Sequence, residues 1–134
     1  MRSILMAMSL AGLATSAGAT DPAALLAEFQ AEAVRADPGF GGFSAVRGAA
    51  FFSQPHGGDW QCTSCHTDQP IQSGRHAVTG KAIAPLAPAA NPQRFTDAAK
   101  VAKWFRRNCR DVLDRECTAA EKGDVLTYLR SLAP

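Results

Sequence analysis

The sequence predicts an all-α fold, and three features of the chain support this prediction. Apolar residues recur at helical spacing in four separate stretches, most of them introduced by a residue suited to cap a helix. Between the second and third stretches lies Cys62-Thr63-Ser64-Cys65-His66, which places two thiols and an imidazole within about one turn of backbone. Such spacing is typical of covalent haem attachment, in which two cysteines join the porphyrin and the histidine ligates iron. We therefore expect helices arranged around one covalently bound haem c.

A Cys-x-x-Cys motif has two uses other than haem attachment. The motif also occurs as a redox-active pair or as half of a zinc site. A zinc site needs further ligands at a compatible spacing, and a thioredoxin-like pair needs a surrounding βαβ pattern that this sequence lacks. The histidine directly after the second cysteine favours haem.

Residues 1–19 have the layout of a secretory signal peptide. Arg2 is basic, residues 4–14 are apolar, and Ala17-Gly18-Ala19 is a small-residue cleavage site. The apolar run is too short to span a bilayer comfortably, so we expect removal of the peptide and no membrane span afterwards. Residues 20–134 then form a single cytochrome c domain in the periplasm, where haem is attached and disulfides form.

Signal cleavage would remove every methionine in the chain. Met1, Met6 and Met8 all lie in the first eight residues. The remaining domain therefore offers no thioether for the sixth coordination position of the iron, which methionine fills in ordinary electron-transfer cytochromes c. Another residue must take that position.

Two helices are predicted before the haem motif. Asp21-Pro22 begins the first, and Asp37-Pro38-Gly39 ends it. Ser44 caps the second, in which Gly48 either allows close helix packing or serves a turn. The apolar positions of the two helices are Leu25, Leu26, Phe29 and Ala33, then Val46, Phe51 and Phe52.

Residues 69–92 are rich in proline and show little periodicity, so we expect a loop there. A long apolar loop in a short domain is expected to wrap the haem. We expect a carbonyl of this loop, that of Pro85, to accept the second ring N–H of His66.

The third predicted helix starts at Thr96, which caps it, and runs to Arg107 or Asn108. Asn108 is the polar member of the predicted apolar face of this helix. A polar side chain in such a position needs a hydrogen-bonding partner. Cations crowd the other side of the helix, where they either attract an acidic partner or form a solvated surface. The predicted apolar face consists of Val101, Trp104, Phe105 and Asn108, and the cations are Lys100, Lys103, Arg106 and Arg107.

Thr118 and Glu121 form a capping box for the last predicted helix. Cys109 and Cys117 precede it, eight positions apart. In an oxidising compartment a disulfide between them is favoured over two free buried thiols, with a gain of about 2–3 kcal/mol.

These residues together resemble a class I cytochrome c, and more closely the sphaeroides haem protein family of oxygen-binding cytochromes. The resemblance covers most of the chain from Cys62 onward and is weaker upstream, at Arg47-Gly48 and Phe52. The matching segments are Cys62-Thr63-Ser64-Cys65-His66, Thr79-Gly80-Lys81, Ile83-Ala84-Pro85-Leu86-Ala87-Pro88, Arg94-Phe95-Thr96-Asp97, Lys103-Trp104, Arg107-Asn108-Cys109, Cys117-Thr118 and Glu121-Lys122.

The resemblance implies a role for each matching site residue. Haem is bound by Cys62, Cys65, His66 and Trp104, with His66 and Asn108 as the iron ligands and a Cys109–Cys117 disulfide. The sequence departs from the family pattern at His56 and His76. Either histidine would hold both iron oxidation states well, and it would make the protein a closed electron carrier instead.

An amide oxygen is a hard ligand that suits ferric iron better than ferrous iron. We therefore expect reduction to release Asn108 and open a site for O2, NO or CO, with electrons supplied by another cytochrome of the dihaem c type or the membrane b type. The alternative is a plain soluble electron carrier with His66 and His76 or His56 on the iron. The sequence offers no convincing acid–base residue beside Asn108, so it does not indicate a classical enzyme. The cations of the third helix are too few to indicate nucleic-acid binding.

Overall fold

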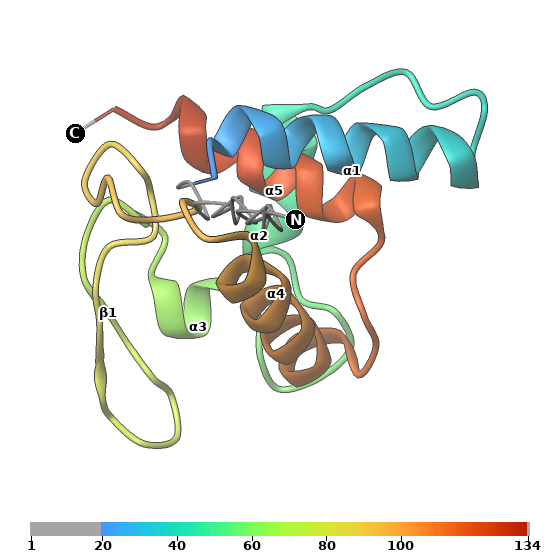
Figure 1. Ribbon diagram of the computed structural model, residues 1–134. Coiled ribbons are helices and arrows are strands. Elements are labelled where there is room, and N and C mark those ends of the chain that lie inside the picture. The colour runs from blue at the N-terminus through green and yellow to red at the C-terminus, as the bar shows by residue number, and fades with distance from the viewer. Residues whose placement is uncertain (1–19, 134) are drawn as a thin grey trace, which may run out of the picture.

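The predicted all-α fold is confirmed by the computed structural model, which describes residues 20–133 (Figure 1). The predicted signal peptide, residues 1–19, lies outside the described residues. Within the described part of the chain, no helix has the length and apolar character needed to cross a membrane. The elements are α1 (Pro22–Ala36), α2 (Ala45–Ser53), α3 (Thr63–His66), β1 (Gly74–Arg75), β2 (Ala82–Ile83), α4 (Ala98–Leu113) and α5 (Ala119–Ser131).

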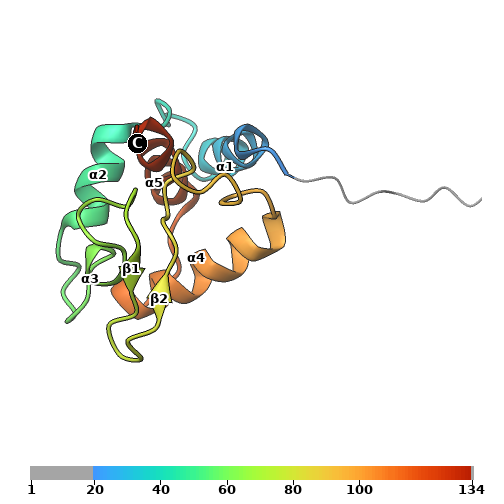
Figure 2. The ribbon, with the colours of Figure 1, turned by 90° about the vertical axis from the view of Figure 1, so that its left-hand side faces the viewer.

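Helix α5 is the centre of the packing, with α1 and α2 on either side of it (Figure 2). One buried cluster joins α1, α4 and α5 through Leu25, Val101 and Leu126. A second cluster joins α2 and α5 through Phe52 and other side chains, and it reaches Cys62 at the start of α3. The core therefore ends at the segment that carries the Cys-x-x-Cys-His motif.

Helices α2 and α5 cross at Gly48, and this contact decides between the two roles considered for that glycine. A Cβ at position 48 would lie 2.0 Å from the backbone oxygen of Asp124, so the residue serves close helix packing. The buried carboxylate of Asp124 accepts the Ser44 N–H at 2.7 Å and the Arg47 Nε–H at 2.8 Å. This ion pair fixes the register of α2 on α5, because the carboxylate binds both the cap and the first turn of α2.

Most helix starts follow the predicted caps, and α4 is the exception. Asp97, and not Thr96, caps α4, with its carboxylate accepting the Lys100 N–H at 3.0 Å. The Thr96 hydroxyl instead donates to the Gln93 carbonyl at 2.9 Å. The predicted end of the helix was also wrong: α4 continues beyond Asn108 to Leu113 and stops at Asp114, which is left-handed with φ 56°.

Two short elements were not expected from the sequence. The haem motif itself forms the four-residue helix α3. The proline-rich stretch contains a small hairpin, in which Gly74 pairs with Ile83 and Arg75 with Ala82. Both elements are too short for a periodic pattern to reveal them.

The capping box of α5 supports a first prediction. The Thr118 hydroxyl accepts the Glu121 N–H, and the Glu121 carboxylate accepts the Thr118 N–H at 2.7 Å. Replacing Thr118 by alanine leaves the Glu121 N–H without its cap, so we expect the free energy of unfolding to fall by about 1 kcal/mol. Urea unfolding followed by far-ultraviolet circular dichroism measures this change, and an unchanged midpoint would contradict it.

Candidate functional site

Helix α3 presents Cys62, Cys65 and His66 from one turn of backbone. The His66 N–H donates to the Cys62 carbonyl at 3.0 Å, and the Cys65 N–H contacts the same oxygen at 3.3 Å. Both thiols are free and partly buried. Cys62 packs against the cluster around Phe52, and burial raises the pKa of its thiol to about 11. Two free thiols on one short turn are suited to addition across two vinyl groups.

The hairpin supports this turn from behind. A Cβ at Gly74 would lie 2.0 Å from the backbone oxygen of Cys65, so only glycine lets β1 lie so close to α3. The Ala77 N–H donates to the Cys65 sulfur at 3.3 Å. Gly74 is therefore a residue of the site that the sequence analysis missed, and nothing in its neighbourhood signalled it.

His66 lies at the edge of the core, with its ring centroid 6.2 Å from that of Phe52. Burial, together with the nearby charge of Arg94, lowers the pKa of His66 to about 4. The imidazole is consequently neutral at ordinary pH, which is the form that binds iron.

The expected hydrogen bond from His66 to the Pro85 carbonyl was wrong. Among the described residues, that carbonyl accepts from Asn91 Nδ2 at 3.2 Å and from Arg94 Nε at 2.8 Å. These two donors use both lone pairs of the oxygen. Arg94 belongs to a segment that matches the family, and the structure shows that it holds the proline loop beside His66.

Helix α4 lies across from α3 and the hairpin (Figures 1 and 2). A cavity of about 500 Å³ separates residues 56–60, which lead toward α3, from residues 110–114 at the end of α4. Val112 lines this cavity and lies one helical turn beyond Asn108. The segment that leads into α3 and the Asn108 end of α4 therefore face a shared space.

The single apolar face predicted for α4 divides into two. Val101 and Phe105 pack into the core, whereas Trp104 is 48% exposed and Asn108 is exposed. At about 100° per residue, Trp104 and Asn108 form a separate stripe beside the core face. A large aromatic ring left open beside an amide is suited to covering a flat apolar ligand.

Cys109 and Cys117 form the disulfide that the resemblance implied, with 5.6 Å between their Cα atoms. Both residues are buried. The bond ties α4 to the start of α5 directly after Asn108, so this part of α4 cannot shift independently of the core.

The two histidines that compete with Asn108 are engaged in their own loops. His56 Nε2 donates to the Phe51 carbonyl at 2.8 Å, and its ring packs on that of Phe51 with 4.5 Å between centroids. His76 is exposed, and its Nδ1 accepts the backbone N–H groups of Val78 and Thr79 at 3.3 and 3.2 Å. Both histidines thus help to order loops.

These residues fit a covalently bound haem. The donor set consists of two free thiols and a neutral imidazole on one turn, and Cys62 and Leu86 lie partly buried at the border of the core cluster. The exposed Trp104 and Asn108 come from α4, which lies across from α3 (Figure 2).

Comparisons with known proteins agree with this interpretation. The family described as a domain of unknown function, DUF1924, matches residues 38–129. The chain is 44% identical to cytochrome c-type protein SHP of Cereibacter sphaeroides, with 96% of each chain covered. It is 41% identical to cytochrome c'' of Methylophilus methylotrophus over 70% of this chain and 68% of that protein.

Solved structures of the same two proteins share the fold. Oxidized SHP, described as an oxygen-binding cytochrome c, superposes with a TM-score of 0.75 at 41% identity, covering 86% of this chain and 100% of that one. Oxidized cytochrome c'' of Methylophilus methylotrophus gives 0.75 at 36% identity, covering 84% and 95%. A solution structure of that cytochrome addresses the detachment of a haem ligand.

Proposed function

The chain belongs to the sphaeroides haem protein family, with haem c as its cofactor, and we propose that its reduced form binds a diatomic gas at a site that Asn108 vacates. One observation carries this proposal. Asn108 is exposed on α4 while the competing side chains, His56 and His76, are engaged in their own loops.

In this proposal Cys62 and Cys65 bind the haem covalently and His66 ligates its iron. The neutral state of His66 and the free state of both thiols support these roles. Trp104 would also help to hold the haem, from the same stripe of α4 that carries Asn108. Haem supplies an iron that accepts one electron and, when one position is free, binds O2, NO or CO.

Asn108 acts as the gate of the site. Its amide oxygen is a hard, neutral donor that suits ferric iron better than ferrous iron, so reduction of a bound haem would release it. The Cys109–Cys117 disulfide keeps the backbone of Asn108 in place, so only the side chain needs to turn away. The SHP relative is an oxygen-binding cytochrome, and ligand detachment is described for cytochrome c''. Both descriptions support a redox-gated site here.

The proposal includes a location and an electron source. Removal of residues 1–19 as a signal peptide would release the domain into the periplasm, where haem c is attached. Another cytochrome, of the dihaem c type or the membrane b type, supplies the electron. The chain is then a ligand-binding electron-transfer protein.

Substitution of Asn108 by alanine tests the gate. We expect the ferric absorption spectrum to change from that of an amide-ligated iron to that of a water-bound or open iron, because alanine has no donor atom. The ferrous protein should still bind CO, since Asn108 is not a ligand in that state. Absorption spectra of the ferric and ferrous proteins, with and without CO, measure both effects.

The histidines provide matched controls for this experiment. His56→Ala and His76→Ala should leave the ferric spectrum unchanged, because both rings are used within their own loops. A spectrum altered by either histidine variant and unaltered in Asn108→Ala would establish the bis-histidine electron carrier instead. A low-spin six-coordinate ferrous spectrum of the unmodified protein would also contradict the proposal.

A further inference from the structure

Helix α4 carries an unusual concentration of positive charge. Its sixteen residues include five cations and a single carboxylate, Asp111, for a net charge of +4. At about 100° per residue the cations fall on one side of the helix, away from Val101 and Phe105. Three of these side chains are largely open to solvent, with exposed fractions of 75% for Lys100, 58% for Arg106 and 65% for Arg110. We name the five residues the α4 basic face: Lys100, Lys103, Arg106, Arg107 and Arg110.

The centre of the α4 basic face is not neutralised by the protein itself. Lys100 pairs with Asp97 at 3.6 Å, and Arg106 and Arg110 approach Glu116 at 4.0 and 3.6 Å. Within the part of the chain that the structure describes, Lys103 and Arg107 have no carboxylate within ion-pair distance. They lie instead over the Trp104 ring, 5.6 and 5.2 Å from its centroid.

This centre adjoins the proposed haem site. Arg107 directly precedes Asn108, and Lys103 directly precedes Trp104. A negatively charged molecule attracted to Lys103 and Arg107 would therefore arrive beside the two α4 residues assigned to the haem.

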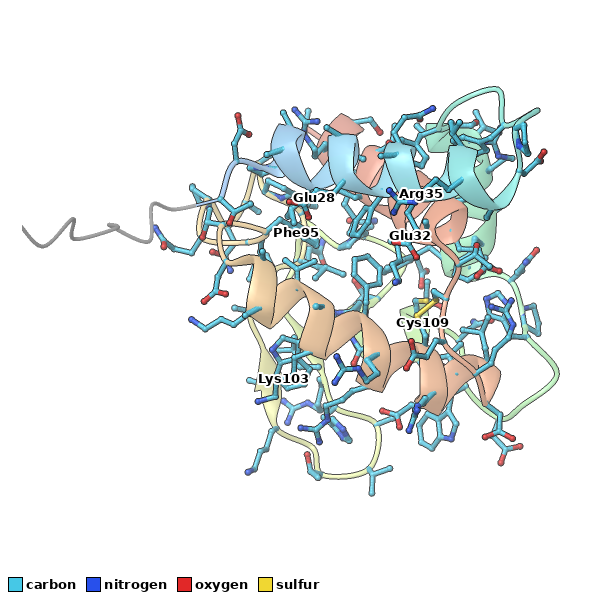
Figure 3. All side chains as sticks on the ribbon, turned by 45° about the vertical axis from the view of Figure 1, so that its right-hand side comes forward. Glu28, Glu32, Arg35, Phe95, Lys103 and Cys109 are labelled. Atoms are coloured by element: carbon cyan, nitrogen blue, oxygen red, sulfur yellow. A yellow bond between two sulfur atoms is a disulfide. The ribbon has the colours of Figure 1, made fainter. Side chains whose placement is uncertain are left out.

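Negative charge gathers on a different part of the molecule. Helix α1 carries Glu28 and Glu32 against a single cation, Arg35, and aspartates cap both of its ends. Figure 3 shows Glu28 and Glu32 on α1 and Lys103 on α4, which are separate sides of the structure. Charge separation of this kind orients an approaching charged partner as well as attracting it.

We propose that the α4 basic face docks an acidic surface of the protein that donates the electron. This inference rests on the proposed function and adds the chemistry of the partner and the place where it binds. The donor protein gives up one electron and is oxidised by one unit, and the haem iron is reduced by one unit. Complementary charge mainly increases the rate of association and makes it sensitive to salt.

Two small oxidants of opposite charge test the local field at the haem. Ferricyanide is a trianion and tris(phenanthroline)cobalt(III) a trication, and each accepts one electron from the ferrous protein. Stopped-flow absorption under argon measures both rates at about 10 mM ionic strength, where the Debye length is about 30 Å. We expect Lys103→Gln/Arg107→Gln to slow the ferricyanide reaction about tenfold and to speed the cobalt reaction.

A matched control removes the same charge elsewhere. Arg35→Gln/Arg130→Gln changes two exposed cations on α1 and α5, and it should leave both rates nearly unchanged. Poly-L-glutamate serves as an acidic polypeptide probe. It should slow ferricyanide oxidation of the unmodified and control proteins by covering the face, and it should have little effect on the α4 variant. Unchanged CO-complex spectra will show that the haem environment is intact in every variant.

The possible failures are distinguishable. If the control variant slows the ferricyanide reaction as much as the α4 variant does, the net charge of the protein is responsible and the docking face is refuted. Equal sensitivity of all three proteins to poly-L-glutamate would refute it as well. A protein that neither oxidant can oxidise would refute the proposed function itself, and with it the inference.

Discussion

Replacing Gly48 by alanine is expected to lower the free energy of unfolding by about 3 kcal/mol, the upper range for overpacking a core. The added Cβ would lie 2.0 Å from the Asp124 backbone oxygen and 2.9 Å from the Tyr128 Cβ. Neither neighbour can move aside easily, because the Asp124 oxygen is part of the α5 backbone and the Tyr128 Cβ is bonded directly to it. Helices α2 and α5 must then separate, although Asp124 holds Ser44 and Arg47 together across the same contact.

The sign of this effect distinguishes packing from helix propensity. Alanine favours an exposed helical position by about 1 kcal/mol over glycine, so propensity alone predicts a more stable variant. Gly41→Ala is the control, since a Cβ there meets nothing within 4 Å. We expect its unfolding midpoint in urea to match that of the unmodified protein. A Gly48→Ala variant as stable as the control would show that α2 and α5 do not approach each other as described.

The helical framework could be predicted because each helix begins with a local chemical signal. Asp21 accepts the Ala23 N–H at 2.9 Å and Ser44 accepts the Arg47 N–H at 3.2 Å, as their positions before apolar repeats suggested. Thr118 and Glu121 likewise form the predicted capping box. These signals depend only on residues within one turn of each other, which is why they can be read without knowledge of the fold.

The end of α4 could not be predicted for the opposite reason. After Asn108 the sequence contains several charged residues of the kind common in loops, namely Arg110, Asp111 and Asp114. The helix continues because Cys109 is buried and bonded to Cys117, a contact made with the start of another helix. The disulfide itself was expected, but its bearing on the length of α4 was not, because Cys109 and Val112 extend the apolar pattern only between polar residues.

The haem motif was identified from its residue types, whereas its surroundings were not. Cys62, Cys65 and His66 are chemically distinctive at their spacing, but Gly74 and Arg94 act only through three-dimensional contacts. Gly74 serves the approach of β1 to the Cys65 carbonyl, and Arg94 binds two carbonyls of the proline loop at Ala84 and Pro85. Neither contact involves residues that are near each other in sequence, so spacing arguments miss both.

Replacing cysteine by serine should have opposite effects on haem attachment at the two cysteine pairs of this chain. In Cys62→Ser/Cys65→Ser we expect complete loss of covalent haem, because a serine hydroxyl does not form the thioether. Acid–acetone extraction should then remove all the pigment, and a pyridine haemochrome should report haem with unmodified vinyl groups. The disulfide of this variant should remain, since Cys109 and Cys117 lie in α4 and at the start of α5.

In Cys109→Ser/Cys117→Ser we expect the haem to stay covalently attached and resistant to extraction. The eight-residue separation of the lost bond predicts a fall of about 2.5 kcal/mol in the free energy of unfolding, from loop-closure entropy. Because Asn108 adjoins Cys109, freeing this end of α4 should also increase the fraction of ferric protein with a water-bound iron. Extractable haem in the Cys109/Cys117 variant, or haem that resists extraction in the Cys62/Cys65 variant, would mean that the two cysteine pairs had been assigned the wrong roles.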